Sequence, residues 1–326
     1  MIEKDVWELE LRDYSYFESI KPERDYLIKN FIPVKSLIMM FSPPASFKSI
    51  LAQYMAICIG SGRECLGCKS KVKGVLLCDR ENNDNLIADK MKKIRRGLGI
   101  RKKDVPVYYL PRNEGDLLNE EFLEKLHHAI KQNKISLVIF DTLHRYGDYQ
   151  ENSADDLSRL YTKCFSPLID KQKVSILFLH HTKKQGDFRG SGDFEGMCDV
   201  VYKLDRKDKS DFFTIKNTKN RTGELEKVTA KITFFDKEII IEKVDKNEDN
   251  QINKLNGLTE KINSYFVETD LRLKTSEIKN QLKKDKFDYS ESTLKRALNK
   301  LVNKKKLEKV GERGGYMKAS SDEANT

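Results

Sequence analysis

One stretch, residues 37–52 with the sequence LIMMFSPPASFKSILA, constrains the fold more than any other part of the 326-residue chain. An apolar run of strand character leads into a turn-forming loop, and Lys48 and Ser49 then open an amphipathic helix. The N–H groups of such a loop and the helix N-terminus attract anions, so this order of elements is typical of a phosphate-binding loop. The stretch predicts a nucleoside triphosphate site in which Lys48 adds a positive charge and the Ser49 hydroxyl holds Mg²⁺.

The loop departs from the pattern G-x-x-x-x-G-K-[ST] at both glycine positions, which Ser42 and Phe47 occupy. Glycine permits unusual backbone angles and close approach to phosphate, so we expect the Phe47 ring to point away from the nucleotide. An ordinary strand, turn and helix with a solvated lysine is the alternative interpretation. In the nucleotide interpretation the binding residues are Ser42, Pro43, Pro44, Ala45, Ser46, Phe47, Lys48, Ser49 and Ile50.

Composition argues against a membrane protein and against a secreted one. Charged residues make up 34% of the chain, and no apolar run approaches the roughly 20 residues of a membrane span. The N-terminus, MIEKDVWELELRD, lacks the basic-then-apolar order of a secretory signal, so we expect a cytoplasmic protein. The six cysteines are scattered as reduced thiols would be, and Cys65-x-x-Cys68 has no second pair nearby, so we do not expect zinc.

The chain is expected to fold into a large α/β domain followed by a small helical one. Apolar runs alternate with helical patterns between residues 37 and 244, as in a twisted, mostly parallel sheet flanked by helices. The expected parallel strands are 36–41, 74–78, 107–110, 137–140, 175–179 and 200–204, the antiparallel ones 212–217, 228–235 and 239–243, and the helices 83–98, 119–132 and 154–171. The expected boundaries are an N-terminal extension 1–25, the α/β domain 26–244, a polar linker 245–256, the small domain 257–318 and a frayed tail 319–326.

The small domain resembles a winged helix-turn-helix domain. Helices are expected over 259–268, 275–283 and 290–303, followed by two short strands that turn at Gly314-Gly315. The third helix should bury Leu294, Ala297, Leu298 and Leu301, which leaves Thr293, Lys295, Arg296, Asn299 and Lys300 available to a DNA groove. Residues 251–326 carry 17 lysines and arginines against 11 acidic residues, a net +6 of the chain's +10. Lys295, Arg296 and Lys300 are therefore expected DNA contacts, and a protein–protein module is the alternative.

Polar residues follow three of the expected strands where the rest of a nucleotide site would lie. Asp141 ends the run LVIFDT and is the expected Mg²⁺-shell carboxylate, although an apolar strand that ends in Asp is also commonplace. Glu81 follows the strand 74–78 and is preferred to Asp79 as the residue that polarises the attacking water; the alternative is a simple helix-terminus acid. His181 ends ILFLHH and could sense the γ-phosphate, with His180 facing the other way; packing is the alternative.

Together these motifs resemble the RecA-like fold, most closely the plasmid RepA-type branch beside the DnaB-type hexameric helicases. The resemblance covers roughly residues 26–241 and rests on the phosphate loop, Glu81, LVIFDT, LFLHHTKK and RGSGDFEGMCDVVYKL. It implies a ring with ATP between subunits, and in IKNTKNRTGE it implies Lys219 as a lysine sensor and Arg221 as an arginine finger acting in trans. A basic β-turn is the alternative for that pair.

The resemblance also implies a partner in the ring channel. Loops 143–153 and 183–193 would face single-stranded DNA, with Lys183, Lys184 and Arg189 on its phosphates. The leading hypothesis is a Mg²⁺-dependent, ring-forming ATPase that acts on DNA, a replicative helicase or translocase of a plasmid, phage or integrated element, assembled as a homo-hexamer. The alternatives are a DNA-binding regulator or helicase loader that uses ATP as an assembly switch, and a RecA-type recombinase or recombination mediator.

Overall fold

The computed structural model of the chain divides into two compact units, Met1–Lys243 and Val244–Thr326, which are described separately. The structure describes residues 11–20, 25–101, 104–112, 115–150, 153–182, 192–206, 210–221, 227–266, 271–310 and 315–319. Within these ranges no helix combines the length and the apolar character needed to cross a bilayer.

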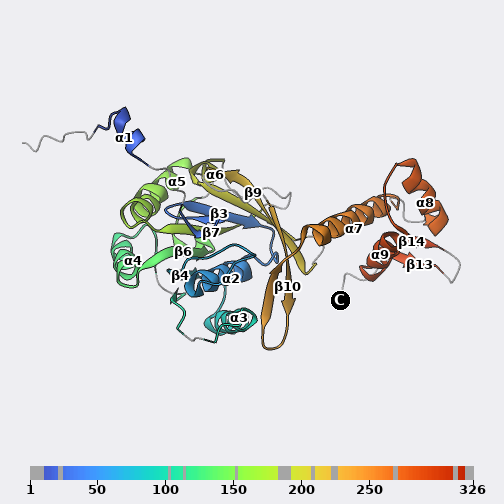
Figure 1. Cartoon of the computed structure of the whole chain (residues 1–326), viewed down its shortest axis with the longest axis horizontal. Helices are drawn as coiled ribbons and strands as arrows, with labels where there is room; N and C mark the ends of the chain where they lie inside the picture. Colours follow the sequence, from blue (N-terminus) through green and yellow to red (C-terminus); the bar gives the residue numbers. More distant parts are fainter. Residues whose placement is uncertain are drawn as a thin grey trace, which may run out of the picture. The chain divides into compact units, whose positions relative to one another are not determined.

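The first unit is built on one nine-stranded sheet with the order β11-β10-β9-β8-β3-β7-β6-β4-β5 (Figure 1). Its strands are β3 (Leu37–Ser42), β4 (Gly74–Asp79), β5 (Val107–Leu110), β6 (Ile135–Asp141), β7 (Ser175–His181), β8 (Val200–Asp205), β9 (Phe212–Asn220), β10 (Lys227–Phe234) and β11 (Ile239–Lys243). The six from β3 to β8 run parallel, and β9, β10 and β11 add antiparallel strands at one edge. The α/β fold class and the antiparallel extension predicted from the sequence are confirmed.

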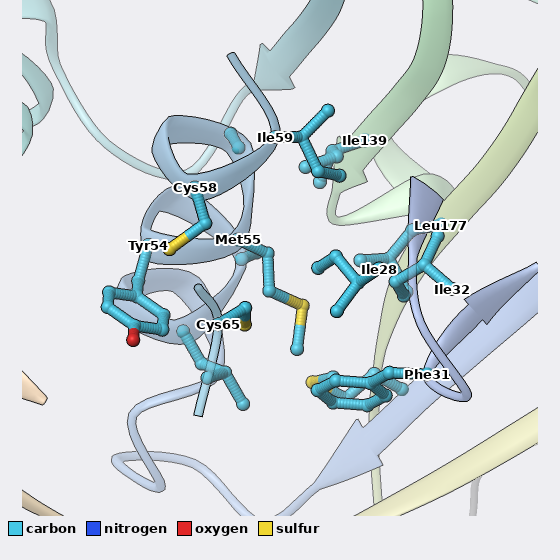
Figure 2. Close-up of a cluster of buried hydrophobic side chains, with 14 of the residues drawn as sticks. Ile28, Phe31, Ile32, Tyr54, Met55, Cys58, Ile59, Cys65, Ile139 and Leu177 are labelled. Carbon is cyan, nitrogen blue, oxygen red and sulfur yellow. The ribbon is translucent and has the colours of Figure 1, made fainter. Parts of the chain in front are cut away.

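Helices cover both faces of the sheet, which explains why its central strands are apolar throughout. Side chains alternate along β6: Leu137 and Ile139 enter one core, whereas Val138 and Phe140 enter the other. Figure 2 shows part of the first core, where the Ile28 side chain lies between Met55 and Leu177. The remaining elements of this unit are α1 (Tyr14–Ser19), β1 (Tyr26–Ile28), β2 (Ile32–Pro33), α2 (Lys48–Ser61), α3 (Asp84–Gly97), α4 (Glu120–Gln132), η1 (Leu143–Tyr146), α5 (Ala154–Leu160), η2 (Tyr161–Phe165), η3 (Pro167–Lys171) and α6 (Gly192–Met197).

Helix α2 is not the amphipathic helix predicted from the sequence, because it is buried on nearly every side. All residues from Leu51 to Gly60 are buried. The sheet packs on one side, while on another the Tyr54 hydroxyl accepts a hydrogen bond from the N–H of Leu66, 3.3 Å away. Gly62 ends the helix in the left-handed conformation that favours glycine.

The predicted helix 154–171 is continuous but irregular. It begins as the α-helix α5 and widens into the two π-helical segments η2 and η3. Pro167 has no N–H to donate, so a regular i to i−4 ladder cannot run through this position.

The second unit contains α7 (Lys246–Ser264), β12 (Arg272–Leu273), α8 (Thr275–Lys284), α9 (Glu291–Asn303), β13 (Leu307–Lys309) and β14 (Tyr316–Lys318), with a sheet of order β12-β14-β13. The predicted linker 245–256 is wrong, because α7 begins at Lys246. Leu255, Leu258 and Ile262 have helical spacing and join the core of this unit, so the segment is part of a packed helix rather than a tether.

Helix α9 carries the predicted buried stripe: Leu294, Ala297, Leu298 and Leu301 are all buried. The short strands β13 and β14 pair antiparallel after it, with Gly315 in a left-handed conformation (φ 94°) before β14. Gly314, the other glycine of the predicted turn, lies outside the described residues.

We expect Gly97→Ala to destabilise the first unit by about 1–3 kcal/mol, the usual range for overpacking. A Cβ at Gly97 would lie 1.9 Å from the carbonyl oxygen of Ile239, so α3 would have to move away from β11. Urea unfolding followed by hydrogen exchange of the β3 and β6 amides would report on this unit alone. Gly196→Ala is the matched control, because a Cβ there meets nothing within 4 Å; equal stability of the two variants would contradict the prediction.

Candidate functional site

A cleft of about 280 Å³ opens beside the carboxyl ends of β3, β4, β7 and β8. In open α/β sheets this edge is where ligands bind. The cleft is lined by Ala45, Ser46, Phe47, Lys48, Ser49, Ile50, Glu81, Lys90, His181 and Arg206. It therefore brings the predicted loop together with the residues predicted at the ends of two later strands.

The phosphate loop holds two non-glycine residues in the left-handed region, Ala45 (φ 58°) and Phe47 (φ 69°). This conformation costs an L-residue about 1–2 kcal/mol. The Phe47 ring packs against Phe213 and Phe234, with centroid distances of 6.0 and 5.8 Å. The ring is thus directed toward β9 and β10, while the backbone of Phe47 forms the N-cap of helix α2.

Lys48 is buried and its ammonium group lies at the floor of the loop. Its Nζ donates to the Ser42 hydroxyl at 3.1 Å and contacts His181 Nδ1 at 3.3 Å. Burial lowers the pKa of Lys48, whereas the charges of Asp141 and Glu81 raise it. Lys48 is thereby directed into the cleft.

Asp141 and Ser49 provide a test of whether Mg²⁺ fits the site. Asp141 is buried, and its Oδ1 accepts no hydrogen bond from the residues that the structure describes. Burial, together with the charge of Asp79, raises the pKa of Asp141 to about 7 against the opposing effect of a hydrogen bond from Ser49. An orphaned carboxylate oxygen beside a hydroxyl is a hard-oxygen set that fits Mg²⁺, which usually takes one or two protein ligands along with phosphate and water.

Two acids lie at the end of β4, and the structure gives them different surroundings. Asp79 is buried and accepts from the N–H groups of Glu81 and Asn82, both at 2.9 Å, so it fixes the turn. Glu81 instead lines the cleft, where its Oε1 lies 3.2 Å from both His181 Nε2 and the Thr142 hydroxyl. The hydrogen bond from His181 lowers the pKa of Glu81 to about 2, so this carboxylate is ionised at neutral pH.

His181 links Lys48 to Glu81. Because an ammonium group only donates, the Nδ1 of His181 accepts from Lys48, and a neutral imidazole then carries its proton on Nε2, which donates to Glu81. His180 faces the other side of the sheet, where it is buried and stacks on Phe194 with centroids 5.4 Å apart. The two histidines therefore have the opposite orientations predicted for them.

Lys219 and Arg221 do not reach the cleft of their own chain. Lys219 Nζ donates to the carbonyl of Glu195 at 2.6 Å, and Arg221 lies 3.9 Å from Asp199. The backbone of Asp199 bonds to both Arg221 and Leu37, at the start of β3. The phosphate loop follows the other end of that strand, roughly 17 Å away at 3.3 Å per residue.

The predicted DNA contacts divide into three groups. Lys183, Lys184 and Arg189 lie outside the described residues. Lys295 and Arg296 are on the exposed side of α9, as predicted. Lys300 is turned toward α7, where its Nζ donates to Asn256 Oδ1 at 2.7 Å, so this lysine is not presented as the sequence pattern suggested.

Three polar residues of the site were missed from the sequence. Arg206 follows directly after β8, and a polar residue at the end of another strand was the available signal. Thr142 follows Asp141 and was passed over beside that acid. Lys90 lies on α3, and nothing in the helical pattern distinguished it from the other lysines there.

A family model described as an AAA domain matches residues 7–187. Among solved structures, one ATPase domain is 14% identical, with a TM-score of 0.48, and the match covers 70% of this chain and 95% of that one. The RadB recombinase is 15% identical, with a TM-score of 0.47 and coverage of 65% and 92%. A DnaB-like replicative helicase, solved in a study of its interactions with primase, is 13% identical, with a TM-score of 0.50 and coverage of 70% and 66%.

No curated protein matches the chain. At identities this low the structural similarity speaks for the fold alone. The DnaB-like helicase, with a TM-score of 0.50, supports the mostly parallel α/β fold predicted from the sequence.

We expect the stability contributed by the Glu81 carboxylate to depend on pH. Its pKa is lowered from 4.5 to about 2 on folding, so the ionised group stabilises the fold above pH 4.5, and this contribution is lost as the pH falls toward 2. The difference in unfolding free energy between wild type and Glu81→Gln should be constant near pH 7 and shrink from about pH 5 to about pH 3. Glu124→Gln, at an exposed glutamate on α4, controls for the lost charge; a Glu81 difference that does not change with pH would contradict the assignment.

Proposed function

The chain belongs to the AAA domain family, and we propose that it is a Mg²⁺-dependent ATPase that assembles as a homo-oligomeric ring and acts on DNA as a helicase or translocase of a mobile element. The observation that carries this proposal is the hydrogen-bonded series Lys48, His181 and Glu81 in one cleft with the phosphate loop. A ring of six subunits, single-stranded DNA in its channel and a winged-helix role for the second unit belong to the same proposal. The exposed Lys295 and Arg296 support that DNA-binding role.

In the proposed reaction the loop N–H groups and Lys48 hold the phosphates of ATP. Glu81 is ionised and directed into the cleft, so it orients a water molecule for attack on the γ-phosphate. Ser49 and Asp141 are the residues that would hold Mg²⁺, which when bound neutralises phosphate charge. His181 reports whether the γ-phosphate is present, because it contacts both Lys48 and Glu81.

Lys219 and Arg221 are proposed to act on the nucleotide of a neighbouring subunit. They lie beside the start of β3, at the end of the strands opposite the cleft of their own chain, so a nucleotide that they contact would have to be bound to another copy. A cation supplied in this way stabilises the charge of the transition state. Their position therefore supports an assembly with ATP at the subunit interface.

An ATP-driven assembly switch is the second candidate function. Ser42 and Phe47 stand where the phosphate-loop pattern has glycine, and a loop with less conformational freedom suits binding better than rapid cycling. This alternative, which includes a DNA-binding regulator or a helicase loader, predicts assembly that requires nucleotide but very slow turnover.

We expect Lys48→Ala to weaken ATP binding at least about 10-fold, and Glu81→Gln to bind ATP nearly as tightly as wild type while its turnover falls about 10²–10³-fold. The measurements are ATP affinity and steady-state hydrolysis, with and without single-stranded DNA. Glu124→Gln is the matched control and should behave as wild type. Wild-type hydrolysis no faster than that of Lys48→Ala would refute the ATPase; nucleotide-dependent assembly with turnover as slow as that of Glu81→Gln would favour the switch.

We expect Lys48→Ala and Arg221→Ala to be inactive separately and to recover roughly a quarter of wild-type hydrolysis when mixed in equal amounts. In a random assembly, one interface in four combines the intact phosphate loop of an Arg221→Ala subunit with the intact Arg221 of a Lys48→Ala subunit. Lys216→Ala, at an exposed lysine on β9, should retain full activity by itself. A mixture that stays inactive would contradict the action of Arg221 in trans.

A further inference from the structure

The second glycine position of the phosphate loop holds the bulkiest residue of that loop. Phe47 is the N-cap of helix α2 and has φ 69° and ψ 13°, backbone angles that glycine adopts freely and that a side chain disfavours. Ala45, two residues earlier, has φ 58°. The surroundings of the loop must therefore supply the stabilisation that holds these two residues in place.

Aromatic rings provide one part of that stabilisation. Phe47 lies edge-on to Phe213 of β9, at an interplanar angle of 68°, and tilted against Phe234 of β10, at 46°. Both arrangements belong to the favourable geometries of aromatic pairs. The antiparallel strands β9 and β10 thus each contribute one aromatic side chain that packs against the Phe47 ring.

Arg206 provides the other part and contacts both strained residues. Its guanidinium carbon lies 3.6 Å from the centroid of the Phe47 ring, a close cation–π contact. Its Nη1 donates to the carbonyl oxygen of Ala45 at 2.7 Å, and its Nε donates to the carbonyl oxygen of Ser210 at 2.6 Å. A planar group with several fixed donors is needed to stack and donate at the same time, which a lysine cannot do.

We propose that Arg206 is a positioning residue that holds the phosphate loop in its nucleotide-binding shape through the Phe47 ring and the Ala45 carbonyl, in place of the conformational freedom that glycine gives other loops. The proposal rests on the proposed function, because it assigns a role at the same nucleotide site. Arg206 borders the cleft but acts through Phe47. The loop N–H groups contact the nucleotide equally before and during the reaction, so loss of Arg206 should raise the nucleotide Kd and KM more than it lowers kcat.

The test is a double-mutant cycle that measures the Kd of a fluorescent ATP analogue with Mg²⁺. Arg206→Ala should weaken binding about 10-fold, and Arg206→Lys should not restore it. In a Phe47→Gly background the strain at position 47 and the ring contact are both removed, and only the contact with the Ala45 carbonyl remains. The further change Arg206→Ala should therefore weaken binding less than about 3-fold. An equal loss in both backgrounds would overturn the proposal, because the effect of Arg206 on binding would then not depend on Phe47.

A matched control and a second readout separate this proposal from the proposed function. Lys231→Ala removes another cation–π contact on the same strands, over Phe212 at 5.7 Å, and should leave Kd unchanged. Hydrogen exchange of the loop amides 45–50 in the nucleotide-free protein should be faster in Arg206→Ala than in wild type and Lys231→Ala. If the protein binds no nucleotide but Arg206→Ala still exchanges faster than wild type, the positioning role of Arg206 is supported and the ATP site is refuted. If Arg206→Ala exchanges as slowly as wild type, the positioning role is overturned even if the protein binds ATP.

Discussion

The register of the parallel strands is the constraint on which the site depends. Ser42 pairs with His181 where β3 meets β7, and Asp79 pairs with Asp141 where β4 meets β6. These in-register ends place residues that are far apart in the sequence along one edge of the sheet. A slip of one residue would turn each side chain to the opposite face, so the packing of the two cores also fixes the chemistry of the edge.

Burial makes the charges of the site mutually dependent. Lys48 and Asp141 are both buried. The charges of Asp141 and Glu81 favour the charged form of Lys48, whereas Asp141 has Lys48 and Ser49 as favourable neighbours and Asp79 and Glu81 as like charges. Removing one charged side chain from a buried set leaves the opposite charge buried without a partner, which destabilises the fold. Substitutions here are therefore expected to affect folding and catalysis together, which is why affinity, turnover and stability are best measured on the same variants.

Much of the fold could be predicted from the sequence, because buried strands and helical periodicity are local signals. The ends of the strands also located Glu81, Asp141 and His181, since parallel strands bring their carboxyl ends together. The burial of α2 on all sides and the turning of Lys300 toward α7 could not be predicted in this way, because both depend on which elements pack beside them. The predicted helix 259–268 overlaps only the second half of α7. The first half was missed because it has the polar composition of a linker, although Leu255, Leu258 and Ile262 have helical spacing.

The burial of α2 has a mechanical consequence. A helix of 14 residues is about 21 Å long, and one packed on nearly every side cannot bend or rotate without repacking its neighbours. The phosphate loop is therefore attached to the N-terminal end of a rigid helix, and Gly60, near the C-terminal end of that helix, lies against Val105. A small displacement at the loop would be carried through the core to the opposite edge of the sheet as a movement of the whole helix.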